Sequence, residues 1–182
     1  MARSARLSST STHMIVAMLV LLVPVIGITV LFTREPAPTI PDIPYPVAAE
    51  RAAAQAEFVL RTPSELPDGW VCTKADWLPA GTPGRAEPVV GDTWTMAFLT
   101  PEQMYIGLDQ RVAAPERFID QRTRDGVPDG TAQVAGESWV RYLSADGVTR
   151  SLVSSGDVVT VVSGDLPYAD LEAFVGLLVP VA

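Results

Sequence analysis

The chain has 182 residues, enough for one domain with an ordinary hydrophobic core. Beyond residue 32 it carries 11 basic and 21 acidic residues, and such an acidic surface does not attract nucleic acid or anionic lipid. The only histidine is His13 and the only cysteine is Cys72. The region after residue 32 therefore cannot form a Ser-His-Asp or Cys-His catalytic group, a histidine-containing zinc site or an internal disulfide.

Residues 14–32 form an apolar run without a charged residue. As a helix these 19 residues rise about 28 Å, close to the thickness of a bilayer's hydrocarbon core. We predict a transmembrane helix that acts as an uncleaved signal anchor, because the run exceeds a secretory signal's apolar region and no small-residue cleavage site follows. Arg3 and Arg6 precede it, so the positive-inside rule predicts a cytoplasmic tail at 1–13 and an extracytoplasmic domain at 47–182, anchored in the plasma membrane.

Residues 33–46 are rich in proline and predict a semi-rigid polyproline spacer between the span and the domain. The alanine-rich segment that follows predicts a helix over 47–60, ended by Thr62 and Pro63. Glu57 and Arg61 are spaced for an i,i+4 ion pair on that helix.

Alternating or continuous apolar runs after residue 69 predict strands. These strands cover residues 70–77, 93–99, 104–110, 132–134, 138–143, 148–153 and 158–163. Tight turns at Asp146-Gly147 and at 155–157 predict an antiparallel meander for the last strands. The strand at 158–163 is apolar on both faces, so we expect it at the centre of the sheet, covered on both sides.

Two further helices are predicted, at 115–122 and at 168–178. The second places Leu171, Phe174 and Leu178 on one apolar face. The order of elements predicts an α+β fold, in which helices pack against an antiparallel sheet.

Few residues suggest chemistry. A Ser–Lys dyad would need Lys74 beside Ser151 or Ser154, and a pair of carboxylates would support glycoside hydrolysis. Residues 125–130 faintly resemble a calcium loop but lack its alternating ligands, so an ordinary loop is favoured. Cys72 is expected to be a buried core residue. No nucleotide motif occurs, and no cofactor or metal is expected.

Carboxylates in this sequence stand mostly in turns, at helix starts or beside arginine, where they stay hydrated and ionised. Examples are Asp68, Asp92, Asp129, Asp146 and Asp157. This distribution favours capping and solubility over acid catalysis.

Aromatic residues fall on or beside the predicted strands, where they either fill the core or line a groove for a sugar or peptide. The residues that could line such a groove are Trp70, Trp94, Tyr105, Trp139 and Tyr142.

Several short motifs follow one another in a recognisable order. They are LPDGW at 66–70, TWTMAFLTP at 93–101, YIGLDQ at 105–110, GESW at 136–139, VTVVSG at 159–164 and a closing DLEAFVGLL helix. With the single N-terminal span, they resemble the actinobacterial domain-of-unknown-function family 4245. The resemblance implies a single-span envelope protein with a small extracytoplasmic domain, and it carries over no catalytic residues. By analogy, the topology is also similar to the Mog1/PsbP-like αβα sandwiches, which implies nothing about function.

We therefore expect a non-enzymatic, single-pass membrane-anchored module that binds a protein or a cell-envelope component. One alternative is a carboxylate-dependent hydrolase acting on envelope glycans. The other is a structural subunit of a membrane complex.

Overall fold

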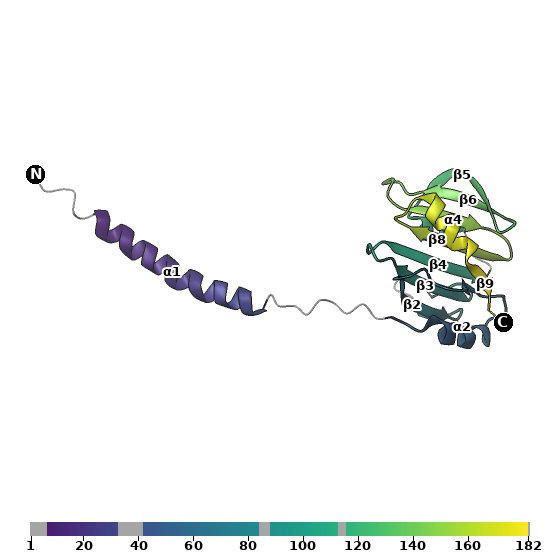
Figure 1. The fold of residues 1–182 in the computed structure, drawn as a ribbon, viewed down its shortest axis with the longest axis horizontal. Coiled ribbons are helices and arrows are strands. Elements are labelled where there is room, and N and C mark those ends of the chain that lie inside the picture. The colour runs from purple at the N-terminus through teal and green to yellow at the C-terminus, as the bar shows by residue number, and fades with distance from the viewer. Residues whose placement is uncertain (1–6, 33–41, 84–87, 113–115, 182) are drawn as a thin grey trace, which may run out of the picture. The chain divides into compact units, whose positions relative to one another are not determined.

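The computed structural model describes residues 7–32, 42–83, 88–112 and 116–181, and it divides the chain into two units at residue 40. The first unit contains one helix, α1 (Leu7–Phe32), which has Pro24 in its interior (Figure 1). This helix begins within the predicted tail, while residues 33–41 of the predicted spacer lie outside the described residues. No helix within the described residues is both long enough and apolar enough to cross a membrane.

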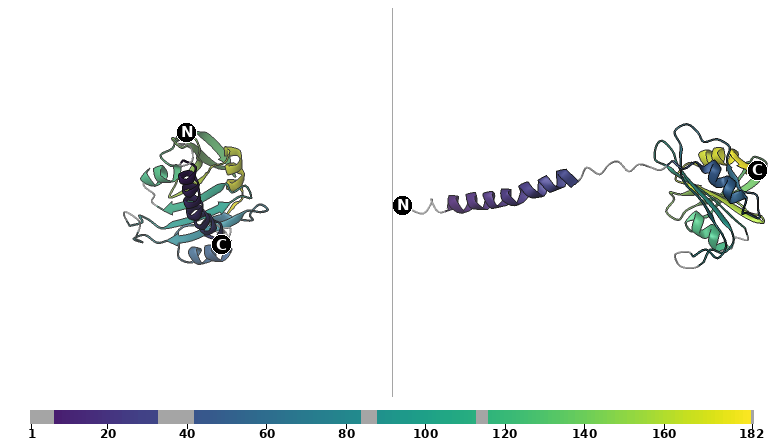
Figure 2. Two further views of the ribbon diagram at one scale, coloured as in Figure 1. Left: turned by 90° about the vertical axis from the view of Figure 1, so that its left-hand side faces the viewer. Right: turned by 90° about the horizontal axis from the view of Figure 1, so that it is seen from below.

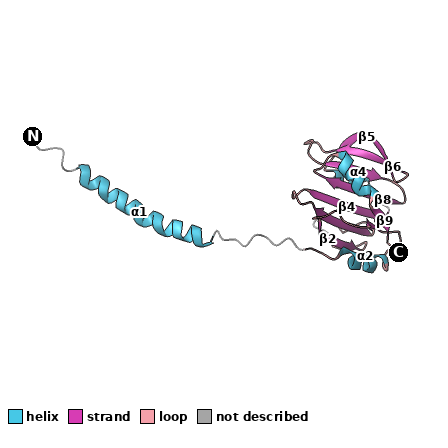
Figure 3. Ribbon diagram, viewed as in Figure 1, coloured by secondary structure: helices cyan, strands magenta, loops and turns pink. Residues whose placement is uncertain are grey.

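The second unit is built on a seven-stranded sheet in which every neighbouring pair of strands is antiparallel (Figure 3). The strands are β2 (Val71–Leu78), β3 (Thr93–Leu99), β4 (Tyr105–Val112), β5 (Val127–Val134), β6 (Glu137–Leu143), β7 (Arg150–Ser154) and β8 (Val158–Gly164). Their order in the sheet is β2-β3-β4-β8-β7-β6-β5. The predicted α+β class, with an antiparallel sheet and a C-terminal meander, is confirmed.

Strand β8 occupies the centre of the sheet, as its sequence predicts. It pairs with β4 on one side and β7 on the other. Val159 and Val161 are buried on one face and Val162 on the other, which a strand covered on both sides requires.

Three helices cover the two faces of this sheet. They are α2 (Tyr45–Ala53), α3 (Glu116–Thr123) and α4 (Tyr168–Gly176). The right-hand view of Figure 2 shows α2 and α4 on one face, which we call the α4 face, and α3 on the other, the α3 face. Because side chains alternate along a strand, each strand contributes residues to both faces.

The predicted helix over 47–60 is wrong in its second half. Helix α2 ends at Ala53, and Arg61–Pro63 instead form a short strand, β1, that pairs with β9 (Leu178–Pro180). The predicted C-terminal helix likewise ends at Gly176 rather than 178. Leu60 is fully buried beside this two-stranded ribbon, so tertiary packing overrides the local helix propensity.

Strand β5 begins at Val127, five residues before the predicted start at Ala132. A bulge between Pro128 and Thr131 interrupts its pairing with β6, and Gly130 takes a φ of +98° there. Most of the predicted loop at 125–130 is therefore strand, hidden in the sequence by Pro128 and Gly130, two residues that rarely occur inside strands.

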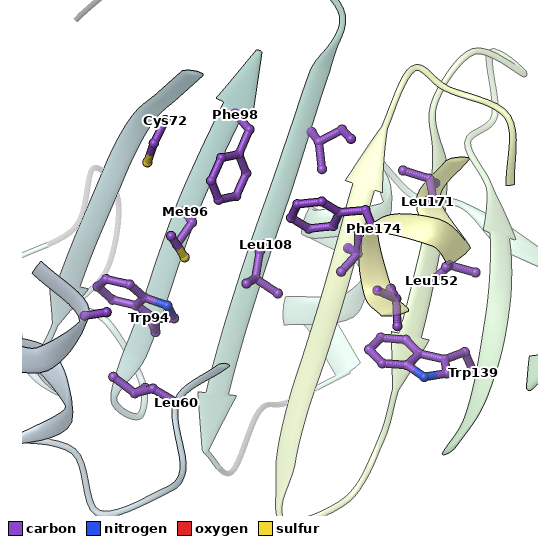
Figure 4. Close-up of a cluster of buried hydrophobic side chains, with 14 of the residues drawn as sticks. Leu60, Cys72, Trp94, Met96, Phe98, Leu108, Trp139, Leu152, Leu171 and Phe174 are labelled. Atoms are coloured by element: carbon purple, nitrogen blue, oxygen red, sulfur yellow. The ribbon is translucent and has the colours of Figure 1, made fainter. Parts of the chain in front are cut away.

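The main core lies on the α4 face and is rich in aromatic rings (Figure 4). Phe174 of α4 lies 5.3 Å from Phe98 and 5.9 Å from Trp70, measured between ring centroids, and stacks on Trp70 at an interplanar angle of 12°. Cys72 is buried in the same core, as predicted, and burial raises the pKa of its thiol to about 11.

Candidate functional site

A hollow opens on the α4 face, between the sheet and the β1–β9 ribbon. It has a volume of about 570 Å³, and we call it the Trp139 hollow. Its apolar lining is Val59, Val134, Ala135, Trp139, Val158, Val175, Leu178 and Pro180. Its polar lining is Arg61, Gln110, Glu137, Ser154, Ser155 and Thr160. A mostly apolar hollow with a few convergent polar groups is typical of small-ligand sites.

Arg61 and Glu137 form a two-pronged ion pair across this hollow, with Arg61 Nη1 donating to Glu137 Oε2 at 2.8 Å and Nη2 contacting Oε1. This pairing lowers the pKa of Glu137, so its carboxylate stays ionised. Gln110 adds a second link, because its Oε1 accepts from the Arg61 backbone N–H at 2.7 Å and its Nε2 donates to Thr160 at 3.2 Å. The polar wall is therefore tightly hydrogen-bonded and preorganised.

Trp139 contributes an unsatisfied donor to this lining. Its ring lines the hollow, its side chain is fully buried, and its indole nitrogen has no hydrogen-bond partner within the described part of the chain. Buried indole N–H groups normally find an acceptor. The Trp139 indole is therefore a buried donor beside the hollow whose acceptor the described residues do not supply.

A second hollow, of about 260 Å³, lies between α4 and the turn before β4. We call it the Trp70 hollow. Trp70 and Phe174 supply aromatic surface, and the carboxylates of Glu102 and Asp170 line the same space. Both acids are exposed to solvent.

A third hollow, the Asp109 hollow, lies on the α3 face and also has a volume of about 260 Å³. It is lined by Tyr105, Asp109, Gln121, Arg122, Arg124, Thr149 and Ser163. Every lining side chain except Asp109 carries a hydrogen-bond donor.

Asp109 is the buried acid that the sequence interpretation missed. It is 3% exposed, accepts a hydrogen bond from Thr95 Oγ1 at 2.8 Å, and lies 3.2 Å from Arg122 Nη2. Burial raises its pKa, although Arg122 and Thr95 act in the opposite direction. The expectation that the acids are hydrated therefore fails at Asp109. The available signal was its position in mid-strand, between Leu108 and Gln110, rather than in a turn.

The structure does not bring the five predicted groove residues together. Trp139 lines its own hollow, Trp70 lines another, and Tyr105 lines the Asp109 hollow on the opposite face. Trp94 is fully buried in the core, and Tyr142 packs beside the Phe118 cluster under α3. The reason is strand alternation, which sends Tyr105 and Tyr142 to one face and the tryptophans of β3 and β6 to the other.

The Ser–Lys dyad is not assembled. Lys74 lies on the edge strand β2, where its ammonium is 3.6 Å from Asp76, while Ser151 and Ser154 lie on β7. Strands β3, β4 and β8 separate them. Across the described residues, no group of three or more His, Cys, Asp or Glu side chains is placed to hold a metal ion.

Comparison with known proteins gives a family but no function. A search of curated proteins found no match. Among solved structures, the complex of Pseudomonas aeruginosa MucA/MucB is similar over 67% of this chain and 35% of that chain, at 15% identity and a TM-score of 0.38. The chain thus spans about a third of the matched chain's length, and so weak a likeness supports no statement about ligand or partner. The family model of DUF4245, described as a protein of unknown function, matches residues 6–178. The chain therefore belongs to the DUF4245 family.

Proposed function

We propose that this protein is a single-pass membrane protein whose extracytoplasmic domain binds a protein or cell-envelope component in the Trp139 hollow, without catalysing a reaction. The observation that carries the binding proposal is the hollow of about 570 Å³, with a preorganised polar wall and the unpartnered indole N–H of Trp139. A ligand that fits has an apolar portion for the valine and leucine wall and a polar group for the wall that contains Arg61 and Glu137.

Membrane anchoring is supported by the sequence of α1 and by its described side chains. The apolar run from residue 14 to 32 has no charged residue, and Met14 and Leu21 are each 71% exposed. Within its own unit, this helix has no partner element among the described residues to cover such side chains. A lipid environment would cover them.

Protease accessibility tests the placement. Protease added to intact cells stripped of their wall is expected to digest the domain and to spare the N-terminal tail. Protection of the domain would overturn the orientation. A mature protein that begins near residue 34 would show that the apolar run is a cleaved signal.

Site-specific photo-crosslinking tests the hollow. A photoreactive residue at Ser155, which lines the hollow and is exposed, is compared with one at Ser138, exposed on the opposite face of the sheet. We expect a discrete crosslinked product in native membranes from position 155 and none from position 138. Ser155→Trp fills the mouth of the hollow and is expected to reduce capture of the same product. Equal crosslinking from both positions would argue against the site.

A second function is favoured by the Trp70 hollow, where Glu102 and Asp170 share one space beside an aromatic ring. Two carboxylates flanking a bound sugar are what a glycoside hydrolase requires. This alternative predicts glycan hydrolysis that is lost in both Glu102→Gln and Asp170→Asn while the protein stays folded. An intact glycan after incubation with the folded wild-type protein would exclude it for that substrate.

A structural role in a membrane complex is the third proposal. It differs from the other two in predicting that filling either hollow leaves the function unchanged.

A further inference from the structure

The Asp109 hollow has a charge opposite to that of the domain around it. Beyond residue 32 the chain has 11 basic and 21 acidic residues, yet this hollow is lined by two arginines and one acid. Arg122 forms an ion pair with Asp109, with 3.2 Å between Arg122 Nη2 and Asp109 Oδ1. Arg124 forms no ion pair with any residue in the described ranges, and it is exposed at the rim. The guanidinium of Arg124 is therefore available to pair with an anion in the hollow.

Hydroxyl groups gather in and beside this hollow. Tyr105 folds over Gly107, whose missing side chain makes room for it, since a Cβ at 107 would lie 2.7 Å from the phenol oxygen. Gly107 pairs in register with Ser163 of β8, and Ser163 pairs with Ser151 of β7. The Ser151 hydroxyl is buried without a hydrogen-bond partner in the described chain. Three hydroxyl-bearing side chains thus lie side by side across neighbouring strands.

We propose that the Asp109 hollow is a second binding site, for a small tetrahedral oxyanion such as sulfate or the phosphate group of a small molecule. Arg122 and Arg124 supply the charge, and Tyr105, Ser163 and Gln121 supply neutral donors. Guanidinium groups match such oxygens in pairs, and a tetrahedral anion has enough oxygens to use donors from several directions. Thr149 takes no part, because its hydroxyl donates to Asp165 at 2.6 Å.

Anion binding at this site should depend on the protonation state of Asp109. As a carboxylate it occupies Arg122 and repels an incoming anion, whereas as a neutral acid it releases Arg122 and can donate. The charged groups that act on Asp109 are Arg122 of α3, Lys74 of β2 and Arg111 of β4, and Tyr105 lies on the same face. Asp109 is the acid of this lining, so a pH effect on binding that disappears in Asp109→Asn is assigned to Asp109. Anion binding should therefore strengthen as the pH falls.

The test uses the full chain in a non-ionic detergent and sulfate as the probe, because sulfate keeps its charge over this pH range. Binding is followed by NMR shifts and by thermal unfolding, against sodium chloride at equal ionic strength. We expect saturable binding that is tighter at pH 5 than at pH 7.5. Arg124→Gln should weaken it about tenfold, the loss expected for one charge-assisted hydrogen bond. Arg51→Gln, an exposed arginine on α2, is the matched control and should leave it unchanged.

Asp109→Asn gives the sharper result. It should bind sulfate more tightly than the wild type does at pH 7.5, and its binding should depend less on pH than that of the wild type. Glycerol phosphate compared with inorganic phosphate then distinguishes a phosphorylated small molecule, which binds more tightly as the ester, from a free anion, which does not. Absence of saturable binding in the folded wild type, or equal effects of Arg124→Gln and Arg51→Gln, would overturn the proposal. Neither result bears on the Trp139 hollow, which lies on the other face.

Discussion

The two faces of the sheet are built from the same strands but bury different kinds of side chain. On the α4 face, Phe98, Leu108 and Leu152 meet α4 in a continuous apolar core. On the α3 face, the short helix α3 covers an apolar cluster centred on Phe118, while Thr95 and Asp109 are buried nearby. An apolar face is stabilised by burial alone, whereas a polar face needs a partner for each buried group. The α3 face therefore buries the acid Asp109 together with its partners Thr95 and Arg122.

The largest expected effect comes from truncating the aromatic residue at the centre of each face. Phe174→Ala should cost about 3–5 kcal/mol of unfolding free energy, because the ring packs between Trp70 and Phe98. Phe118→Ala should cost less, because Arg111, 4.2 Å from the ring centroid, has a flexible side chain that can move into the space. Denaturant unfolding of both variants measures the difference. A larger loss for Phe118→Ala would reverse the contrast between the faces.

The second effect concerns acids whose pKa values move in opposite directions on the two faces. Asp109 has a raised pKa in the folded state, so the native protein binds its proton more tightly than the unfolded chain does. Its contribution to stability is full below its unfolded pKa, about 3.9, and is lost as the pH rises through the folded pKa. Asp109→Asn should therefore remove this loss and be at least as stable as the wild type at pH 7. Urea unfolding from pH 4 to 8 is the measurement, and a variant clearly less stable at pH 7 would contradict it.

Glu137 on the α4 face should show the opposite dependence with a smaller amplitude. Its pKa is lowered by Arg61, so its stabilising effect is present above its unfolded pKa and is lost as the pH falls through the folded one. The Glu137 side chain is 40% exposed, so Glu137→Gln should cost no more than about 1 kcal/mol. The same urea series measures it. A loss at pH 7 as large as that of Phe174→Ala would mean that the ion pair holds the ribbon in place.

The smallest effect on stability should come from Gly107→Ala. The new methyl group meets only the end of the Tyr105 side chain, which is 41% exposed and can swing away. We expect an unfolding free energy within about 0.5 kcal/mol of the wild type, together with weaker sulfate binding. Tyrosine fluorescence quenching would report the released ring. Unchanged sulfate affinity would remove Tyr105 from the proposed anion site.

The periodicity of the sequence was sufficient for the large sheet and for the place of its central strand. The valines on both faces of β8 predicted its central position, because a strand covered on both faces has apolar residues on both. The β1–β9 ribbon could not be predicted, because Arg61–Pro63 follow a helical segment and find their partner near the other end of the domain. Three residues of strand carry too little pattern to outweigh helix propensity.

The candidate sites were harder to predict than the fold. Periodicity shows that Tyr105 and Trp139 lie on strands, but the face of each depends on register. For Tyr105, register depends on the pairing of β4 with β8, about 50 residues later in the chain. Asp109 was missed for a related reason. A lone aspartate in a strand is exposed or buried according to what crosses over it, and α3 is placed by tertiary contacts with β7 and β8.

The β1–β9 ribbon also sets an order on folding. It joins Arg61 to Pro180, so one wall of the Trp139 hollow is made from the two ends of the domain. Contacts so distant in sequence carry a high loop-closure cost and form late. The strands β5–β8 can pair with neighbours that are close in sequence, whereas the ribbon can form only after residues 178–180 have been synthesised. We therefore expect the Trp139 hollow to be among the last features to form, and a ligand bound there to stabilise the folded domain.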